Sequence, residues 1–209
     1  YGVGVQSDLT CKLYRCNIFN NFSNSQYGSG IQPGGAMMFD CYITNNVCSS
    51  HGGGMSAQTL LAQNCVFADN VSSNTGGAAY IVKWNSITSV FDRCTFVRNR
   101  AKSGGGAVYS SGKGCDAIFS NCVFTANEVF NSGSGGAVLG TYPSDAPWLC
   151  EFHGCAFTNN VSKSNGGAIC INDSNVLGVL PIRVRGCVFT SNTCASAGGA
   201  IGFAGKLFS

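Results

Sequence analysis

Cysteine is the most promising side chain for chemistry in this sequence, because thirteen cysteines occur in 209 residues. So many thiols are unusual in a reducing compartment, and they form no paired Cys-x-x-Cys units of the kind that bind zinc. Seven of them, from Cys16 to Cys187, open the motif Cys-x-Φ-x-x-Asn, in which Φ is apolar. Side chains alternate along a strand, so the cysteine and Φ should face one apolar interior, where a thiol is inert. The cysteines therefore predict secretion and no catalytic thiol.

Some of these cysteines should form disulfides, although the sequence does not assign the partners. If the motifs stack as strands, equivalent cysteines lie ~4.8 Å apart, a Cα separation that a disulfide accepts. The odd number leaves at least one thiol outside any disulfide. Further candidates are the cysteines outside the motif: Cys11, Cys48, Cys115, Cys150, Cys170 and Cys194.

Acid–base and metal chemistry have few candidate residues. The nine acidic residues are dispersed without an Asp-Asp pair, whereas sugar hydrolases need paired carboxylates and calcium needs clustered ones. Only the folding of the chain could bring Asp40, Asp69 and Asp92 together, and solvated turn residues are the favoured interpretation. The two histidines, His51 and His153, lie in different repeats. We therefore expect no catalytic, cofactor-binding or metal site, and a protein that is not an enzyme.

Four Asn-x-Ser/Thr sequons are candidate N-glycosylation sites, at Asn21, Asn70, Asn160 and Asn172. The first three coincide with the asparagine of the cysteine motif. An asparagine that is buried in a stack of equivalent asparagines cannot carry a glycan, so both outcomes stay open for these three. Asn172 lies outside the motif, and we favour it as the glycosylated residue of a eukaryotic protein.

All these residues belong to a repeat of 24 to about 32 residues with three apolar segments. The first segment is the cysteine motif. The second is a glycine block, commonly Gly-Gly-Ala-Φ, which follows a short polar link. The third is a stretch of alternating apolar residues before each cysteine, such as Leu9, Cys11 and Leu13. The cysteine motifs begin at Cys16, Cys41, Cys65, Cys94, Cys122, Cys155 and Cys187, and the glycine blocks at Gly2, Gly28, Gly52, Gly76, Gly105, Gly135, Gly166 and Gly198.

Three short strands and three bends per repeat predict an all-β fold, a right-handed parallel β-helix of about seven coils with three short strands per coil. A unit this small cannot bury its own apolar face, whereas stacked units share a continuous core. The cysteines and the Φ residues should form two buried columns. We expect residues 1–209 to form one domain, which is part of a longer chain or of a stacked assembly because it begins inside a repeat.

The remaining motif residues should shape the bends. Asparagine tolerates left-handed backbone geometry and can bond to equivalent asparagines of neighbouring coils, which would form an amide ladder. The glycine pair permits positive φ and a close approach of neighbouring backbones. The motif residues therefore have structural roles.

The segment between a glycine block and the next cysteine lengthens along the chain. It spans 10 or 11 residues after Val5, Ile31 and Met55, but 17 or 18 after Val138 and Ile169. The insertions should lie on one side of the rod, where they either form a recognition face or merely cover the edge of the core. The candidate recognition residues are Trp84, Tyr109, Lys113, Tyr142 and Trp148.

Charge and hydropathy exclude two further classes of protein. The formal net charge of +3 comes from scattered residues and offers no electrostatic footprint for nucleic acid. The apolar stretches, such as residues 176–181, are too short to cross a bilayer. We expect no nucleic-acid partner and no transmembrane segment.

The alternation of Phe-x-x-Asn with Gly-Gly-Ala-Φ resembles the repeat of the chlamydial polymorphic outer-membrane proteins, and more loosely pectin-lyase-like repeats of bacterial and protist surface proteins. The resemblance runs through almost the whole chain, for example VFADN at 66–70 and TFVRN at 95–99. A cysteine two residues before nearly every Phe departs from that family. The resemblance implies a β-helical fold and surface exposure, as an adhesin or an autotransporter passenger.

We therefore expect an extracellular or cell-surface structural or adhesive scaffold, and our finer hypothesis is a glycosylated filament subunit that stacks head to tail. The expected partners are further copies or flanking coils, and host or matrix glycans or proteins, without a cofactor. The alternative is a carbohydrate-binding or carbohydrate-cleaving pectin-lyase-like domain. Acidic residues that converge in one groove would favour this alternative.

Overall fold

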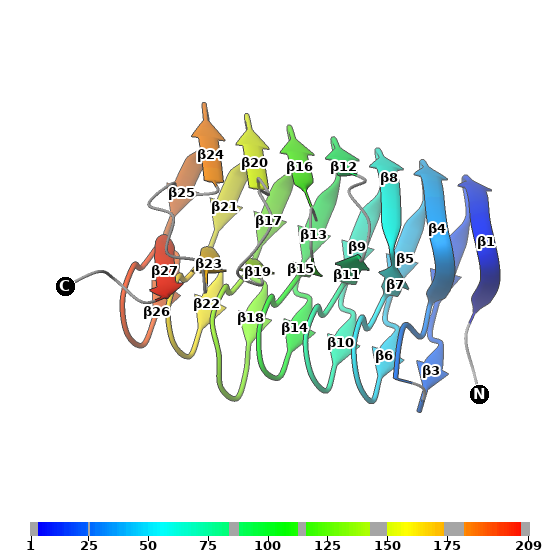
Figure 1. Cartoon of the computed structure of the whole chain (residues 1–209), viewed down its shortest axis with the longest axis horizontal. Coiled ribbons are helices and arrows are strands. Elements are labelled where there is room, and N and C mark those ends of the chain that lie inside the picture. The colour runs from blue at the N-terminus through cyan, green and yellow to red at the C-terminus, as the bar shows by residue number, and fades with distance from the viewer. Residues whose placement is uncertain are drawn as a thin grey trace.

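The structure is a computed structural model that describes residues 4–24, 26–83, 88–112, 116–142, 150–173 and 182–205. These residues form strands and no helix, and they wind into a right-handed parallel β-helix whose coils stack along one axis (Figure 1). The predicted all-β fold is confirmed. Within the same ranges there is no helix long and apolar enough to cross a membrane.

A complete coil contains four short strands, which we name by their place in the repeat. The leading strands, before each motif cysteine, are β8 (Thr59–Gln63), β12 (Ser89–Asp92), β16 (Ala117–Ser120), β20 (Cys150–His153) and β24 (Ile182–Arg185). The cysteine strands, directly after that cysteine, are β2 (Asn17–Phe19), β5 (Tyr42–Thr44), β9 (Val66–Ala68), β13 (Thr95–Val97), β17 (Val123–Thr125), β21 (Ala156–Thr158) and β25 (Val188–Thr190).

The other two kinds of strand complete the coil. The asparagine strands, after each motif asparagine, are β3 (Phe22–Ser23), β6 (Val47–Cys48), β10 (Val71–Ser72), β14 (Arg100–Ala101), β18 (Glu128–Val129), β22 (Val161–Ser162) and β26 (Thr193–Cys194). The glycine strands, after each glycine pair, are β7 (Met55–Ala57), β11 (Ala79–Lys83), β15 (Val108–Gly112), β19 (Val138–Tyr142), β23 (Ile169–Asp173) and β27 (Ile201–Gly205). In the first coils, β1 (Val5–Tyr14) and β4 (Ile31–Phe39) run through the glycine and leading positions without a break.

Three parallel sheets run along the rod. The cysteine strands and the asparagine strands form one seven-stranded sheet each, while the leading and glycine strands share a thirteen-stranded sheet through β4. A coil therefore has four strands where the sequence indicated three, because the two-residue asparagine strand lies in what reads as a polar link. So short a strand has no periodicity of its own, and only its pairing with neighbouring coils defines it.

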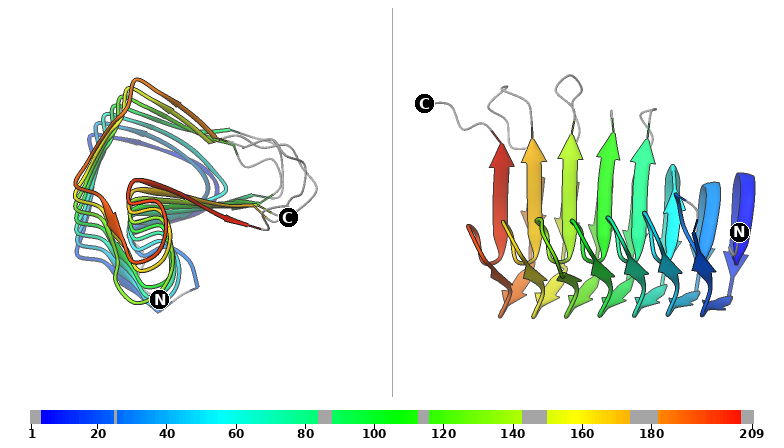
Figure 2. Two further views of the ribbon diagram at one scale, coloured as in Figure 1. Left: turned by 90° about the vertical axis from the view of Figure 1, so that its left-hand side faces the viewer. Right: turned by 90° about the horizontal axis from the view of Figure 1, so that it is seen from below.

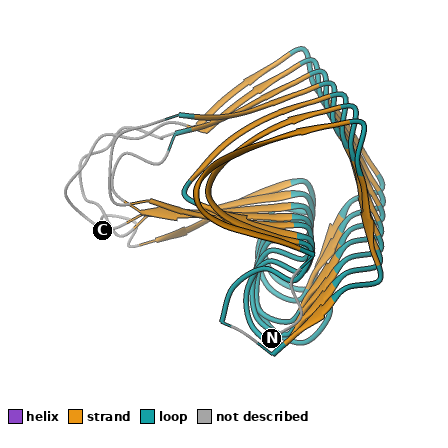
Figure 3. Ribbon diagram, turned by 90° about the vertical axis from the view of Figure 1, so that its right-hand side faces the viewer, coloured by secondary structure: helices purple, strands orange, loops and turns teal. Residues whose placement is uncertain are grey.

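Neighbouring coils pair in register, so identical motif positions stack. Lys83 pairs with Gly112, and Tyr142 pairs with Asp173, which pairs with Gly205. The glycine strands therefore end at one edge of the coil (Figure 2). Seen along the axis, the asparagine strands and the loops that follow them form a narrow lobe beside the wider part of the coil (Figure 3).

The core contains two columns of stacked phenyl rings. In the cysteine strands, Phe96 and Phe124 stack with centroids 4.7 Å apart at 3°. In the leading strands, Phe91 and Phe119 stack at 4.8 Å, and Phe91 meets Phe96 edge-on at 69°. The fully buried members are Phe67, Phe91, Phe96, Phe119, Phe124, Phe152 and Phe157. The predicted Φ column is thus confirmed; in the first coil Ile18 occupies it, whereas Phe19 is 56% exposed.

The motif cysteines form a second column beside the phenyl rings, as predicted. Those of the inner coils are buried, and each Sγ donates to the carbonyl two residues earlier, as Cys122 does to Ser120 at 3.3 Å. Burial and the neighbouring thiol together raise the pKa of Cys155: the hydrogen bond with Cys122 contributes most, followed by desolvation. The Cys155 thiol is therefore a protonated packing group.

The motif asparagines form the predicted amide ladder. Asn99 donates from both its backbone N and its Nδ2 to the Oδ1 of Asn127, at 3.0 Å each. The same pattern continues through Asn21, Asn46, Asn70, Asn99, Asn127, Asn160 and Asn192. Every Nδ2 from Asn46 onward also donates to a carbonyl of the preceding coil, for example from Asn99 to Phe67 at 2.9 Å. The ladder thus joins each coil to both neighbours.

The left-handed residue of this bend precedes the motif asparagine, which corrects the expectation that the asparagine itself adopts that geometry. These residues have φ between 51° and 57°: Asn20, Asn45, Asp69, Arg98, Ala126, Asn159 and Ser191. Their types vary because stacking imposes the backbone shape, whereas the next position needs an amide. The first glycine of each pair has positive φ, as predicted, and a Cβ on the second, for example Gly106, would collide with the backbone of Gly136.

Candidate functional site

The outward face of the glycine strands carries a column of polar and aromatic side chains. Ser56 of β7 pairs with Tyr80 of β11, which pairs with Tyr109 of β15. Because side chains alternate along these strands, the residues on either side of Tyr80 are buried while Tyr80 projects outward. The rings of Tyr80 and Tyr109 stack with centroids 5.3 Å apart at 6°.

Two further rings reach this column from the narrow lobe. Tyr27 and His51 each precede the first glycine of a pair, and they form an isolated parallel bridge. The His51 ring lies 4.4 Å from Tyr80 and 5.9 Å from Tyr27, while Tyr27 and Tyr80 are 5.8 Å apart. Nδ1 of His51 lies 2.8 Å from Oγ1 of Thr75, and burial lowers the pKa of His51. We call Tyr27, His51, Tyr80 and Tyr109 the aromatic cluster.

A pocket of about 350 Å³ opens beside this cluster. It is lined by Tyr27, Gln32, Ser56, Ala57, Gln58, Tyr80 and Val82. Strands β7 and β8 are separated by a single residue, Gln58. Strand β11 of the next coil is longer than β7 and extends beyond Ile81, the last residue that pairs with β7, so Val82 forms one wall of the pocket. The pocket therefore lies at the step between the short-turned coils and the first coil with an insertion.

The pocket offers neutral hydrogen-bonding groups. Its lining contains two side-chain amides, a serine hydroxyl and two phenols, and no acidic or basic side chain among the lining residues. Burial, followed by the neighbouring Tyr109 and Tyr27, raises the pKa of Tyr80 to about 12. The Tyr80 phenol is therefore protonated at neutral pH and can donate a hydrogen bond.

The predicted recognition residues are only partly placed by the structure. Tyr109 belongs to the aromatic cluster, and its OH accepts a hydrogen bond of 2.6 Å from Thr141. Tyr142 is the last residue of β19, at the edge of the coil where the glycine strands end. Trp84, Lys113 and Trp148 lie outside the described residues.

The sequons differ in accessibility. Asn70 and Asn160 are fully buried, and each Nδ2 donates two hydrogen bonds within the core, for example from Asn160 to Phe124 and Asn192. Asn21, at the first rung of the ladder, is partly exposed. Asn172 is exposed in β23, two residues beyond Cys170 on the outward face. Glycosylation of Asn172 stays a prediction, and the folded ladder leaves no room for a glycan on Asn70 or Asn160.

The expected disulfides are absent among the cysteines that the structure describes, which corrects that prediction. In parallel strands paired in register, equivalent Cβ atoms are about 4.8 Å apart, beyond the roughly 3.5–4.5 Å of a disulfide. The Cα separation alone was therefore a misleading criterion. Cys115 lies outside the described residues.

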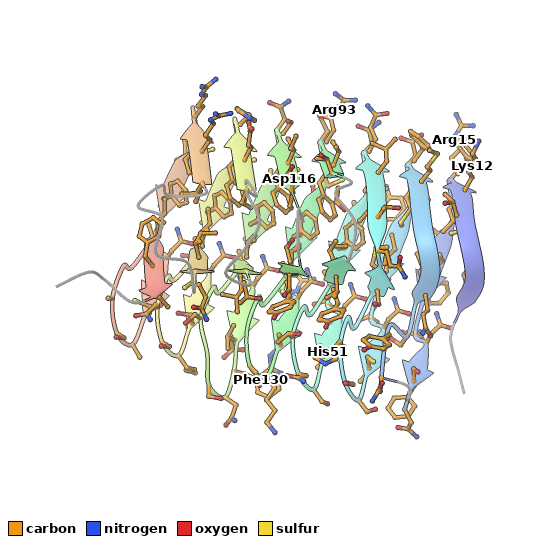
Figure 4. All side chains as sticks on the ribbon, viewed as in Figure 1. Lys12, Arg15, His51, Arg93, Asp116 and Phe130 are labelled. Carbon is orange, nitrogen blue, oxygen red and sulfur yellow. The ribbon has the colours of Figure 1, made fainter. Side chains whose placement is uncertain are left out.

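Asp40, Asp69, Asp92 and the two histidines do not converge on one site, and His153 instead pairs with Glu151 of its own strand β20, with Nε2 2.7 Å from the carboxylate. Asp92 is the last residue of the leading strand β12, Asp40 lies in the bend after β4, and Asp69 lies in the bend after a cysteine strand. Figure 4 shows Arg93, the neighbour of Asp92, at the far end of the coil from His51. Each of the three aspartates accepts a hydrogen bond from a neighbouring side chain. The donors are Asn64 for Asp40 at 3.2 Å, Arg98 for Asp69 at 2.7 Å and Gln63 for Asp92 at 3.0 Å. In the described ranges no three His, Cys, Asp or Glu side chains form a group suited to a metal ion.

Sequence reasoning missed the pocket because its residues carry no shared motif. Tyr27 and Tyr80 belong to different coils and to different positions of the repeat. The one local signal was that YGSGIQ at 27–32 nearly duplicates YGVGVQ at 1–6. The second of these segments contains both Tyr27 and Gln32. The pairing of coils brings them to Gln58 and Tyr80.

These features define the class of protein: a parallel β-helix in which one repeat forms each coil. Two segments, residues 93–111 and 154–172, match the family model of the Chlamydia polymorphic membrane protein (Chlamydia_PMP) repeat. Each segment runs from the bend before a motif cysteine through a cysteine strand and an asparagine strand into a glycine strand. The chain is accordingly a β-helix similar to these Pmp proteins. No curated protein and no solved structure matches it.

Proposed function

We propose that the chain is an extracellular or cell-surface scaffold that takes part in attachment. The observation that carries the proposal is the match of two repeats to the Chlamydia polymorphic membrane protein repeat. The proteins of that family are named as membrane proteins, and the same repeat here forms a β-helix. The match therefore supports a location at the cell surface.

The construction of the rod supports a presenting role. The amide ladder and the phenyl columns connect every coil to the next, so that the core is rigid along its length. The pocket and the edge with the insertions lie on this core at spacings that the coils set. Recognition residues are commonly presented in this way on rigid scaffolds.

We propose no catalytic role for the chain. The aspartates considered for acid–base chemistry pair with side chains of the rod's own surface, as Asp69 does with Arg98. Such carboxylates stabilise charge on neighbouring coils and face no common substrate position. Cleavage of carbohydrate is therefore the less favoured alternative, whereas binding of carbohydrate is compatible with the pocket.

The partners that we propose for the two ends of the rod are further β-helix coils, from flanking sequence or from a second copy. Phe189 and Ile201 of the last described coil are partly exposed, whereas their counterparts Phe157 and Ile169 are fully buried. An added coil would bury these side chains and continue the sheets. If the added coil belongs to another copy of the chain, the stacked copies form a filament.

Surface labelling tests the location of the protein. Intact cells that produce it are treated with a membrane-impermeant amine-reactive biotin, and the peptides that contain the exposed Lys102 and Lys163 are quantified by mass spectrometry. We expect both lysines to be labelled, with a cytoplasmic protein of the same cells as the unlabelled control. Labelling that requires lysis of the cells would contradict the proposal.

A further inference from the structure

We propose that the pocket beside the aromatic cluster binds an uncharged sugar residue of a glycan. The proposal rests on the attachment function above and names the chemical class of its ligand. It concerns residues of three coils, Tyr27, Gln32, Gln58 and Tyr80 above all, that no motif of the repeat unites.

The chemistry of the lining selects for neutral polar groups. Side-chain amides and hydroxyls both donate and accept hydrogen bonds, as do the hydroxyls of a sugar. The lining residues Gln32, Ser56 and Gln58 supply such groups, and no lining residue has a charged side chain. A carboxylated or sulfated sugar would lose hydration in this pocket without gaining an ion pair.

The aromatic wall supplies the apolar contact. Tyr27 is 39% exposed, so it is accessible, while His51 and Tyr80 pack against it at 5.9 and 5.8 Å. An aromatic ring braced in this way offers a flat apolar surface to the C–H face of a sugar and loses little conformational entropy on binding. Val82, two residues beyond Tyr80 in β11, adds a further apolar contact surface.

The size of the pocket fits a small ligand. Its volume of about 350 Å³ lies near the lower end of the roughly 300–1,000 Å³ typical of small-molecule sites. The pocket opens to solvent on the outward face of the rod, so the rest of a glycan chain can extend away from the protein. The site is consequently suited to one residue of a longer glycan.

A glycan array tests the proposal with the full chain. The array carries oligosaccharides of glucose, galactose, mannose and N-acetylglucosamine beside sialylated and sulfated ones, and the best-bound neutral oligosaccharide is then titrated by calorimetry. Tyr27→Ala and Gln58→Ala should each weaken binding about tenfold. Tyr42→Ala is the matched control, because Tyr42 is 53% exposed in a cysteine strand away from the pocket.

Gln58→Ala should leave the fold intact, because Gln58 is an exposed side chain in the turn between β7 and β8. Weaker binding by this variant therefore reports on the pocket and not on misfolding. Binding of a neutral oligosaccharide that Gln58→Ala weakens and Tyr42→Ala leaves within about twofold supports the pocket. Binding restricted to charged glycans, no binding at all, or affinity insensitive to Tyr27→Ala and Gln58→Ala overturns it. A protein that is surface-labelled yet binds no neutral sugar refutes the pocket and leaves the scaffold function intact.

Discussion

The Nδ2 of Asn127 donates a hydrogen bond of 3.0 Å to the Oδ1 of Asn160, a residue 33 positions further along the chain. The same Nδ2 donates to the carbonyl of Phe96 at 3.0 Å, and the Oδ1 accepts from the backbone N and the Nδ2 of Asn99. One fully buried amide thus links three successive coils. Its bonding is complete, because both amide hydrogens and both lone pairs have partners.

Replacing this amide should destabilise the whole rod. Asn127→Ala removes four hydrogen bonds, leaves groups of Phe96 and Asn99 without this partner, and takes from the Oδ1 of Asn160 one of its two donors. We expect the free energy of unfolding to fall by roughly 3–5 kcal/mol. Urea unfolding followed by circular dichroism measures the change. The exposed Asn131 gives the control, since Asn131→Ala should cost less than about 0.5 kcal/mol; equal losses in the two variants would refute a stabilising ladder.

The phenyl column should be equally sensitive to truncation. Phe124 lies between Phe96 and Phe157, with centroids 4.7 and 4.6 Å away, and is fully buried. Phe124→Ala leaves a cavity in the core, and we expect a loss of roughly 3–5 kcal/mol in urea unfolding. Phe22→Ala, at a side chain that is 56% exposed, should change stability by about 0.5 kcal/mol or less. A small effect of Phe124→Ala would mean that the column is not packed as described.

Alkaline pH should weaken the fold. Burial raises the pKa of Cys170 from 9.0 to about 11 and that of Tyr80 from 10.0 to about 12. The folded chain therefore holds these protons to a higher pH than the unfolded chain does. The contribution of Cys170 is complete below about pH 9 and is lost as the pH rises to about 11, and that of Tyr80 is lost between about pH 10 and 12.

Urea unfolding at about pH 7, 9 and 10.5 measures this dependence. Cys170→Ser removes the thiol that titrates, so its stability should fall less steeply between the two higher values. A wild-type free energy of unfolding that stays constant or rises over this range would contradict the assignment of a buried, protonated Cys170.

Glycosylation should distinguish the exposed sequon from those of the ladder. On expression in a eukaryotic secretory pathway, we expect a glycan on Asn172, which is exposed, and none on the fully buried Asn70 and Asn160. Endoglycosidase treatment and peptide mass spectrometry measure occupancy, and Asn172→Gln should remove the glycan from the peptide that contains residue 172. Asn160→Gln should leave the glycan mass unchanged and lower stability, because it disrupts the ladder. A glycan peptide that contains Asn70 or Asn160 would show that the ladder does not form there.

Much of this architecture could be predicted because one repeat encodes one coil. The motif places a cysteine, an apolar residue and an asparagine at constant offsets, so alternation alone sends Cys122 and Phe124 to the same interior. Once coils stack in register, equivalent residues must form columns. The amide ladder and the positive φ of the glycine pairs follow from the same rule.

The arrangement of side chains across coils could not be predicted in this way. Tyr27 and Tyr80 meet because the lobe of one coil lies beside a glycine strand two coils further on. The distance between equivalent Cβ atoms, which excludes vertical disulfides, follows from in-register parallel pairing. The left-handed position before each asparagine is occupied by residues as different as Arg98 and Ala126, so composition does not reveal it.

The sequence by itself thus determined the coil, the two faces of each strand and the columns that hold the rod together. Those features depend on alternation within a few residues and on exact repetition. Only the tertiary structure decided the pocket, the aromatic cluster and the absence of disulfides among the described cysteines. Each of these depends on distances between coils, which are set by the pairing of strand residues 24 or more positions apart, such as Val47 and Val71, and leave no local trace in the chain.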